Sequence, residues 1–335
     1  MDPGALSTGV LYKCQIDCRV YIFYLVCYTV SSNEKEEMLM VLELRDIEKS
    51  FGPKKVLTGV GFRAEGGKAF GLLGRNGAGK TTAIRILMNV FPANAGDVLI
   101  DGAPIDYTKV QIGYLPEERG LYPKKIILDQ LIYFAELKGM SRKDAIRSID
   151  YWLDRLGMME YRNKRLDTLS KGNQQKIQLI TAVAHDPDIV ILDEPFSGLD
   201  PVNAMLLKDV VRELIAKGKI VLFSSHQMSY IEEFCDSIAI LNKGVVALSG
   251  DLHEIKRNYV RDKLVVRTED SQAVCRAFPG SCTTMDDGGL LLKMRSPEDK
   301  QVTMKRLVDE FDVDEVKVFE PSLNDIFVEY AGEGV

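Results

Sequence analysis

The sequence predicts an alternating α/β domain over residues 40–257 and a small α+β domain over residues 260–332. Three observations support this division. Short continuous apolar runs alternate with stretches of helical spacing in the first part of the chain. A glycine-rich turn joins one of these runs to a helix, and the alternation is lost after about residue 260. Continuous apolar runs bounded by turns are typical of parallel strands that are buried on both faces.

The size and charge of the chain are those of an ordinary globular protein. It has 335 residues, 46% hydrophobic and 27% charged, which suits about two domains. The net charge is −6 and the two signs are mixed along the chain, so we expect no nucleic-acid partner. The longest apolar run covers residues 20–30, whereas a membrane-spanning helix needs about 20 apolar residues. We therefore expect a cytoplasmic protein.

Residues 1–37 do not share the pattern of the rest of the chain. They have no clear period and end in a polar stretch, and Met38 and Met40 come directly before the first convincing strand. We interpret them as a disordered extension that reflects an upstream start site or an artefact. A partner-binding or membrane-surface arm is the alternative interpretation.

The strands and helices follow from apolar spacing. In the first domain we expect strands at 41–44, 69–73, 189–192 and 220–223, and helices at 79–90 and 202–217. In the second domain we expect strands at 264–267, 290–294 and 313–318, and helices at 273–278, 300–311 and 323–330. Asp200 is placed to cap the helix 202–217, and Pro201 suits its first turn. The second domain carries no catalytic motif.

The glycine-rich turn after the strand 69–73 matches the phosphate-binding P-loop, because it follows a strand and opens a helix. Its glycines let backbone N–H groups point at phosphate oxygens, and the helix N-terminus adds a favourable dipole. Lys80 would reach the β- and γ-phosphates, and the Thr81 hydroxyl would hold Mg²⁺. The turn thus predicts binding of ATP by Gly74, Asn76, Gly77, Ala78, Gly79, Lys80, Thr81 and Thr82.

Two acids, Asp193 and Glu194, follow the strand 189–192. Sheets of this class bind ligands at the carboxyl ends of their strands. We expect Asp193 to bind Mg²⁺ and Glu194 to act as the general base on the attacking water. An acid-rich helix start is the alternative, which the neighbouring P-loop argues against.

A second anion-binding helix start follows Leu169. Ser170 and the N–H of Gly172 lie at the beginning of a helix that runs to about residue 184. A single nucleotide cannot easily use both this helix start and the P-loop of the same chain. We therefore expect a second copy of the chain to contribute one of them.

The order of these motifs resembles the nucleotide-binding domain of ABC transporters. The P-loop is followed by a Leu-Ser-x-Gly signature, the Asp-Glu pair, a D-loop over 197–200 and a switch histidine, His226. The resemblance covers residues 40–257 and implies a RecA-like core with an antiparallel β subdomain and a helical signature subdomain. It also implies ATP hydrolysis, a homodimer and an integral membrane permease, through which the chain would lie peripherally on the inner face of the cell membrane.

The resemblance implies a role for each motif residue. Phe51 matches the aromatic that stacks on adenine. Ser170 and Gly172 would contact the γ-phosphate of the nucleotide bound to the other subunit, and Asp200 would bridge the dimer. His226 would contact the γ-phosphate and hold the catalytic carboxylate and the water in line.

The motifs also depart from the family's usual pattern. Lys171 stands where the family usually has Gly, and Asn173 where it usually has Gln. In the Q-loop, Glu117 or the adjacent Glu118 stands where a Gln normally meets Mg²⁺, and we assign that position to Glu117. The Q-loop and signature residues that depart in this way resemble those of the sodium-efflux branch of ABC exporters. The tail 321–327 resembles the end of the small C-terminal accessory domain of that branch.

Two other functions remain as alternatives. The first is a soluble ABC ATPase without a transport role, although such proteins usually carry two ATPase domains or a coiled-coil insertion. The second is a non-catalytic ATP-binding module, which Glu194 and His226 argue against. For a transporter, the resemblance places the permease contact on the region 126–157, with Arg119 linking that contact to hydrolysis.

Overall fold

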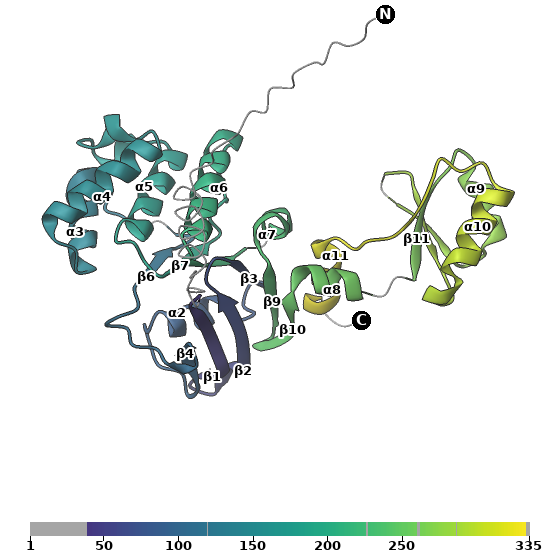
Figure 1. Ribbon diagram of the computed structural model, residues 1–335, viewed down its shortest axis with the longest axis horizontal. Helices are drawn as coiled ribbons and strands as arrows, with labels where there is room; N and C mark the ends of the chain where they lie inside the picture. Colours follow the sequence, from purple (N-terminus) through teal and green to yellow (C-terminus); the bar gives the residue numbers. More distant parts are fainter. Residues whose placement is uncertain (1–38, 119, 226, 260–261, 286, 333–335) are drawn as a thin grey trace, which may run out of the picture. The chain divides into compact units, whose positions relative to one another are not determined.

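The computed structural model describes residues 39–118, 120–225, 227–259, 262–285 and 287–332. It divides into a unit of residues 1–39 and a unit of residues 40–335, and the description below concerns the second unit (Figure 1). The expectations for residues 1–37, Arg119 and His226 lie outside the described residues.

The centre of the first domain is a six-stranded sheet in the order β10-β9-β3-β8-β7-β6. Its strands from β9 to β6 run parallel, and β10 pairs antiparallel with β9. The strands are β3 (Ala69–Gly74), β6 (Ile112–Leu115), β7 (Ile189–Asp193), β8 (Ile220–Ser224), β9 (Ser237–Asn242) and β10 (Val245–Asp251). Every residue of β3, β7 and β8 is buried, which confirms the strands that the continuous apolar runs predict.

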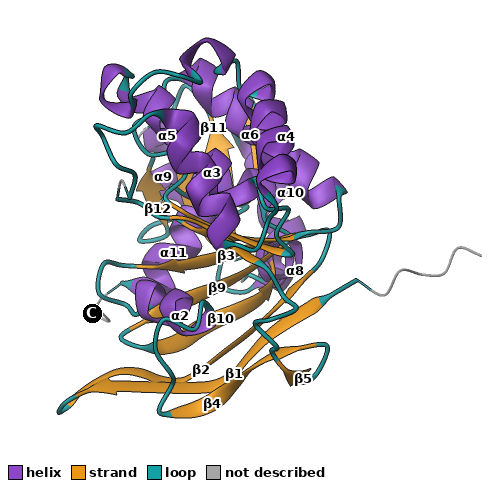
Figure 2. Cartoon of the chain, turned by 90° about the vertical axis from the view of Figure 1, so that its left-hand side faces the viewer, coloured by secondary structure: helices purple, strands orange, loops and turns teal. Residues whose placement is uncertain are grey.

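A second, antiparallel sheet has the order β2-β1-β4-β5. Its strands are β1 (Val41–Phe51), β2 (Lys54–Glu65), β4 (Ala95–Ile100) and β5 (Ala103–Pro104). Figure 2 shows α2 (Lys80–Leu87) between this sheet and the six-stranded sheet. Phe62 stacks on Phe70 at 4.8 Å, so aromatic packing joins the two sheets in one core.

The remaining helices of the first domain are amphipathic and pack on the parallel sheet or on one another. They are α3 (Ile127–Leu137), α4 (Arg142–Arg155), α5 (Lys171–Val183), α6 (Pro201–Ala216), α7 (Met228–Phe234) and α8 (Leu252–Asn258). α3, α4 and α5 bury Leu131, Ile149 and Ile180 in a common core, which forms the helical subdomain. The expected ABC-type fold, with its RecA-like core, antiparallel subdomain and helical subdomain, is confirmed.

The small domain is built on a four-stranded antiparallel sheet in the order β12-β13-β11-β14. Its elements are β11 (Lys263–Arg267), α9 (Ser271–Ala277), β12 (Cys282–Thr284), β13 (Leu290–Lys293), α10 (Lys300–Glu310) and β14 (Glu315–Val318). Its core is separate and includes Leu264, Val274, Leu292 and Leu307. The sequence predicted all of these elements except β12, whose three residues are too few to show a period.

The last helix, α11 (Leu323–Ala331), departs from the expected division. We predicted it as part of the small domain, but Leu323, Ile326 and Ala331 are buried in the core of the first domain. The Asn242 side-chain amide also donates to the Tyr330 carbonyl oxygen at 3.0 Å. Sequence spacing shows only that α11 has an apolar face, and its partner is decided by packing. The boundaries 40–257 and 260–332 stay a prediction of folding units.

Within the part of the chain that the structure describes, no helix is both long and apolar enough to cross a membrane.

The packing of α11 generates a stability prediction. Because Ile326 is fully buried in the core of the first domain, we expect Ile326→Ala to lower the free energy of unfolding by about 2–5 kcal/mol. Val328→Ala on the exposed face of the same helix should change it by less than about 0.5 kcal/mol. Chemical denaturation of both variants, followed by tryptophan fluorescence, measures the difference. Equal stabilities would contradict the docking of α11.

Candidate nucleotide-binding site

The P-loop is the turn between β3 and α2. Two of its glycines lie where a side chain would collide with neighbouring atoms. A Cβ on Gly74 would lie 2.6 Å from the Leu241 carbonyl oxygen, and a Cβ on Gly79 would lie 2.6 Å from Leu57 Cδ2. Gly79 also has a φ of 114°, which glycine adopts at little cost. The backbone can therefore curl around a phosphate at the start of a helix whose dipole favours an anion.

The Lys80 ammonium lies inside this loop. Its Nζ donates to the carbonyl oxygens of Gly74, at 2.6 Å, and Arg75, at 3.4 Å. Burial lowers the pKa of Lys80, and the carboxylates of Glu194 and Asp193 oppose that shift. A partly buried cation beside an anion-binding turn is suited to hold nucleotide phosphates.

Asp193 is the last residue of β7 and is buried. Burial raises the pKa of its carboxyl group, and a hydrogen bond from the Tyr114 hydroxyl, at 3.3 Å, is among the effects that oppose the rise. Burial, together with the Asp193 charge, raises the pKa of Tyr114 to about 12. Tyr114 therefore stays a hydrogen-bond donor to this carboxylate at neutral pH.

Glu194 has a backbone conformation that is rare for a residue with a side chain. Its φ is 48°, in the left-handed region, which costs about 1–3 kcal/mol. Its N–H donates to the Ser224 carbonyl oxygen at 2.8 Å, and the Ser225 hydroxyl donates to its Oε2 at 3.0 Å. These bonds hold the carboxylate at the carboxyl ends of β7 and β8, where sheets of this class bind ligands.

Most of the predicted site residues share one cleft with a volume of about 1120 Å³. Those that line it are Phe51, Gly74, Asn76, Gly77, Gly79, Lys80, Thr81, Thr82, Glu117, Asp193 and Glu194. Ala78 is buried behind the loop, where its carbonyl oxygen accepts a hydrogen bond from the Gly244 N–H at 3.0 Å. The cleft thus combines an anion-binding turn, a cation, acidic groups and an aromatic side chain.

Phe51 ends β1 and supplies the aromatic side of the cleft. Its ring is 49% exposed and meets Phe91 edge to face at 5.5 Å between centroids. The Lys49 ammonium lies 5.4 Å from the centroid of the Phe51 ring. These two contacts support the ring, and its exposed surface is available to a planar base.

Besides Ala78, three predicted nucleotide contacts do not line this cleft: Ser170, Gly172 and Asp200. Ser170 caps α5 by accepting a hydrogen bond from the Asn173 N–H at 3.3 Å, and its own surface is exposed. Asp200 caps α6 in the same way and is also exposed. Within one chain, only one of the two helix starts that are predicted to bind phosphate therefore lines the cleft.

Several residues of the site escaped the sequence analysis. The cleft is also lined by Lys54, Lys55, Val56, Arg75, Lys243 and Phe327, and its carboxylates are held by Tyr114 and Ser225. The basic pair that follows Phe51 is a signal that could have been used, because cations attract phosphate. Lys243 and Phe327 give no such signal, since they reach the cleft only through the packing of β9, β10 and α11.

Two family models match the chain. The model described as "ABC transporter" matches residues 57–197, which contain the P-loop, the signature and the carboxylate pair. The model described as "ATP-binding protein DrrA1-3-like, C-terminal domain" matches residues 250–331, from the end of β10 to α11. Together they match much of the alternating α/β domain and the tail after it, and they leave residues 40–56 and 198–249 unmatched.

Relatives agree with these matches. The uncharacterized ABC transporter ATP-binding protein YhaQ of Bacillus subtilis is 41% identical over 294 residues, which cover 87% of this chain and 99% of that protein. The ABC transporter ATP-binding protein NatA of the same organism is 34% identical over 225 residues, or 64% and 91% of the two chains. A solved structure of an ATP-binding subunit of an ABC transporter has a TM-score of 0.60 and 30% identity, over 65% and 93% of the chains.

The exposed ring of Phe51 generates a binding prediction. We expect Phe51→Ala to weaken binding of ATP by about 1–3 kcal/mol, the scale of one base stacked on an aromatic ring. Titration with a fluorescent ATP analogue measures the affinity. Tyr133→Ala is a matched control, because Tyr133 is 50% exposed and does not line the cleft. Unchanged affinity in Phe51→Ala would mean that another group holds the base.

Proposed function

This chain belongs to the ABC transporter ATP-binding proteins, and we propose that it is the motor subunit of an exporter, in which two copies enclose two ATP molecules and drive a separate membrane permease. As an ABC-type ATPase it binds and hydrolyses ATP. The assembly with a permease would place it on the inner face of the cell membrane.

One observation carries the proposed dimer. The P-loop and the carboxylates line the nucleotide cleft, whereas Ser170, Gly172 and Asp200 lie outside it. Ser170 and Asp200 are nevertheless exposed at the starts of α5 and α6, where the helix dipole favours an anion. A second copy placed head to tail would bring its Ser170 and Gly172 to the γ-phosphate, so each site would be completed by the partner.

Hydrolysis is assigned to Glu194. The hydrogen bond from Ser225 and the left-handed backbone orient its carboxylate beside Lys80, on whose pKa the Glu194 charge acts. A carboxylate in this position can accept the proton of the attacking water. His226 would hold the same water in line with the γ-phosphate.

Mg²⁺ is the metal that the residues of the cleft fit. Thr81, Glu117 and Asp193 line the cleft and would supply oxygen ligands, which Mg²⁺ prefers. No group of three or more His, Cys, Asp or Glu side chains that could hold a metal ion occurs among the described residues. Water and nucleotide phosphates would complete the coordination, as is usual for Mg²⁺ at phosphate-transfer sites. The ion would neutralise charge on the β- and γ-phosphates.

The permease contact is proposed on the exposed side chains in and just before α3, which we call the α3 patch: Tyr122, Ile126, Tyr133 and Leu137. Of the other apolar residues of α3, Ile127, Leu131, Ile132 and Ala135 are buried in the helical subdomain, and Leu128 and Phe134 are half-buried. Tyr122 stacks on Phe134 at 6.3 Å between ring centroids, which adds to the aromatic surface. An exposed apolar patch of this kind suits the docking of an amphipathic helix.

A hydrogen-bonded connection runs from the Q-loop to the signature helix. The Gln178 side-chain amide of α5 donates to the carbonyl oxygens of Pro116, at 3.2 Å, and Glu118, at 3.0 Å. These residues flank Glu117, which lines the nucleotide cleft. A movement of the helical subdomain would therefore displace the Q-loop and the start of α5 together, which suits coupling between the permease and hydrolysis.

The branch within the family is also a proposal. The Q-loop and signature residues resemble the sodium-efflux exporters, and the match of residues 250–331 to a DrrA1-3-like C-terminal domain agrees with an exporter that has an accessory domain. The transported substrate would be Na⁺ or a drug-like molecule selected by the permease.

Complementation between two inactive variants tests the composite site. Lys80→Ala removes the phosphate-binding cation and Ser170→Arg blocks the signature, so we expect each variant alone to lose most ATPase activity. A mixture should regain activity, because the P-loop of Ser170→Arg and the signature of Lys80→Ala form one intact site. The ATPase rate of the mixture is measured against total protein concentration. A mixture as inactive as its parents would refute the head-to-tail dimer.

The α3 patch generates a coupling prediction. We expect Leu137→Glu to weaken the apparent affinity for the permease by about 1–2 kcal/mol, the usual scale for an interface side chain. The basal ATPase rate should not change, because Leu137 does not line the cleft. Val302→Glu, at an equally exposed valine of α10, is the control. Equal loss of basal and permease-stimulated rates would contradict the docking role.

A further inference from the structure

Asn203, in the first turn of α6, is bonded to the D-loop through both its backbone and its side chain. Its N–H donates to Asp200 Oδ1 at 3.0 Å, and its side-chain Nδ2 donates to Asp200 Oδ2 at 2.5 Å. The hydrogen bond from the Asn203 backbone is the largest of the effects that lower the pKa of the exposed Asp200 carboxyl. The two bonds fix both carboxylate oxygens in one orientation.

The same amide lies against the signature. A Cβ built on Gly172 would be 3.0 Å from Asn203 Nδ2 and 3.8 Å from Leu199 Cδ2. Gly172 does not have a positive φ, so its backbone conformation does not require glycine. It is the approach of Asn203 that leaves little room for a side chain at Gly172.

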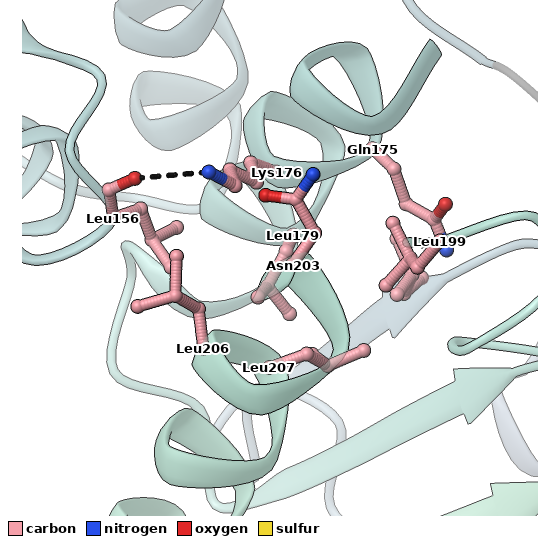
Figure 3. Close-up of a pocket in the computed structure, with 9 residues that line it drawn as sticks. Leu156, Gln175, Lys176, Leu179, Leu199, Asn203, Leu206 and Leu207 are labelled. Carbon is pink, nitrogen blue, oxygen red and sulfur yellow. Dashed lines mark hydrogen bonds between the residues drawn. The ribbon is translucent and has the colours of Figure 1, made fainter. Parts of the chain in front are cut away.

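The surroundings of this contact are a narrow apolar crevice between α5 and α6. It is lined from α5 by Gln175, Lys176 and Leu179, and from the D-loop and α6 by Leu199, Asn203, Leu206 and Leu207. Figure 3 shows the α5 and α6 side chains on either side of it. Lys176 donates to the Leu156 carbonyl oxygen, and the Asp200 charge opposes the lowering of its pKa by burial. Packing and the Asp200 charge thus join the two helix starts, while the Lys176 hydrogen bond ties α5 to the end of α4.

We propose that Asn203 is a positioning residue that joins the signature turn to the D-loop of the same chain, so that Ser170, Gly172 and Asp200 meet the partner's nucleotide as one rigid unit. This inference rests on the proposed head-to-tail dimer, in which both loops act on the site of the other copy. The distance between the signature turn and the D-loop must then be set within one chain before the dimer closes. The Asn203 side chain bonds to Asp200 and lies against Gly172.

The alternative is that Asn203 only stabilises α6. The two roles can be separated, because Asn203→Ala removes the side-chain amide and keeps the backbone N–H that Asp200 caps. The helix start should therefore survive, and the melting temperature should stay close to that of the wild type. The affinity of the isolated chain for ATP should also be unchanged, since Asn203 does not line the nucleotide cleft.

The first measurement is the steady-state ATPase rate of Asn203→Ala. We expect kcat to fall about tenfold, the scale of one lost hydrogen bond to a charged group, with little change in ATP affinity. Asn203→Asp keeps the shape of the side chain but replaces the donor by a carboxylate that repels Asp200. It should lose at least as much activity as Asn203→Ala. A wild-type kcat in either variant would overturn the proposal.

The deciding measurement is complementation with Lys80→Ala, with the mixture of Ser170→Arg and Lys80→Ala run in parallel. We expect the mixture of Asn203→Ala and Lys80→Ala to regain activity, because Lys80→Ala supplies an intact signature and D-loop in trans. If only the Ser170→Arg mixture regains activity, Asn203 acts within its own chain and the inference is wrong. If neither mixture does, the head-to-tail dimer itself fails and this inference fails with it.

Discussion

The close packing of three segments at the turn between β9 and β10 is the constraint on which the nucleotide cleft depends. Gly244 in this turn donates its N–H to the Ala78 carbonyl oxygen of the P-loop, and its own carbonyl oxygen accepts from the Thr58 N–H of β2. A Cβ on Gly244 would lie 2.2 Å from the Val56 carbonyl oxygen. Any side chain here would push the P-loop and the antiparallel sheet apart. Next to this turn, the Asn242 side-chain amide at the end of β9 donates a hydrogen bond to the Tyr330 carbonyl oxygen of α11.

The electrostatics of the cleft follow from this packing. Burial acts in opposite directions on its two kinds of charged group, lowering the pKa of Lys80 and raising that of Asp193. Each group therefore loses part of its hydration and gains from the neighbouring opposite charge. Phosphate oxygens would add negative charge beside Lys80, and a divalent cation would add positive charge beside Asp193. The arrangement suits a ligand that carries an anion and a metal together more than either one alone.

Helix α5 contacts the three parts of the proposed mechanism that must move together: the signature turn, the Q-loop and α3. Its N-terminal turn contains Ser170 and Gly172, and Gly172 lies against Asn203 of α6. Gln178, near the middle of α5, donates two hydrogen bonds to the Q-loop. Its residues also pack with α3, which carries the proposed permease contact. Because a helix is stiff over 13 residues, a displacement of α3 would be passed to the signature and the Q-loop at once. The geometry offers a physical reason for coupling these events.

The amino-acid sequence alone determined the fold class and the strands β3, β7 and β8, and it predicted the residues that would bind phosphate. These features are local: a buried parallel strand shows as an apolar run, and a P-loop needs its glycines and Lys80 at a set spacing. Only the tertiary structure decided that α11 packs on the first domain and that Phe327 lines the cleft. It also decided the contact of Asn203 with Gly172, because contacts between segments far apart along the chain depend on how the elements pack, and periodicity and spacing carry no information about that.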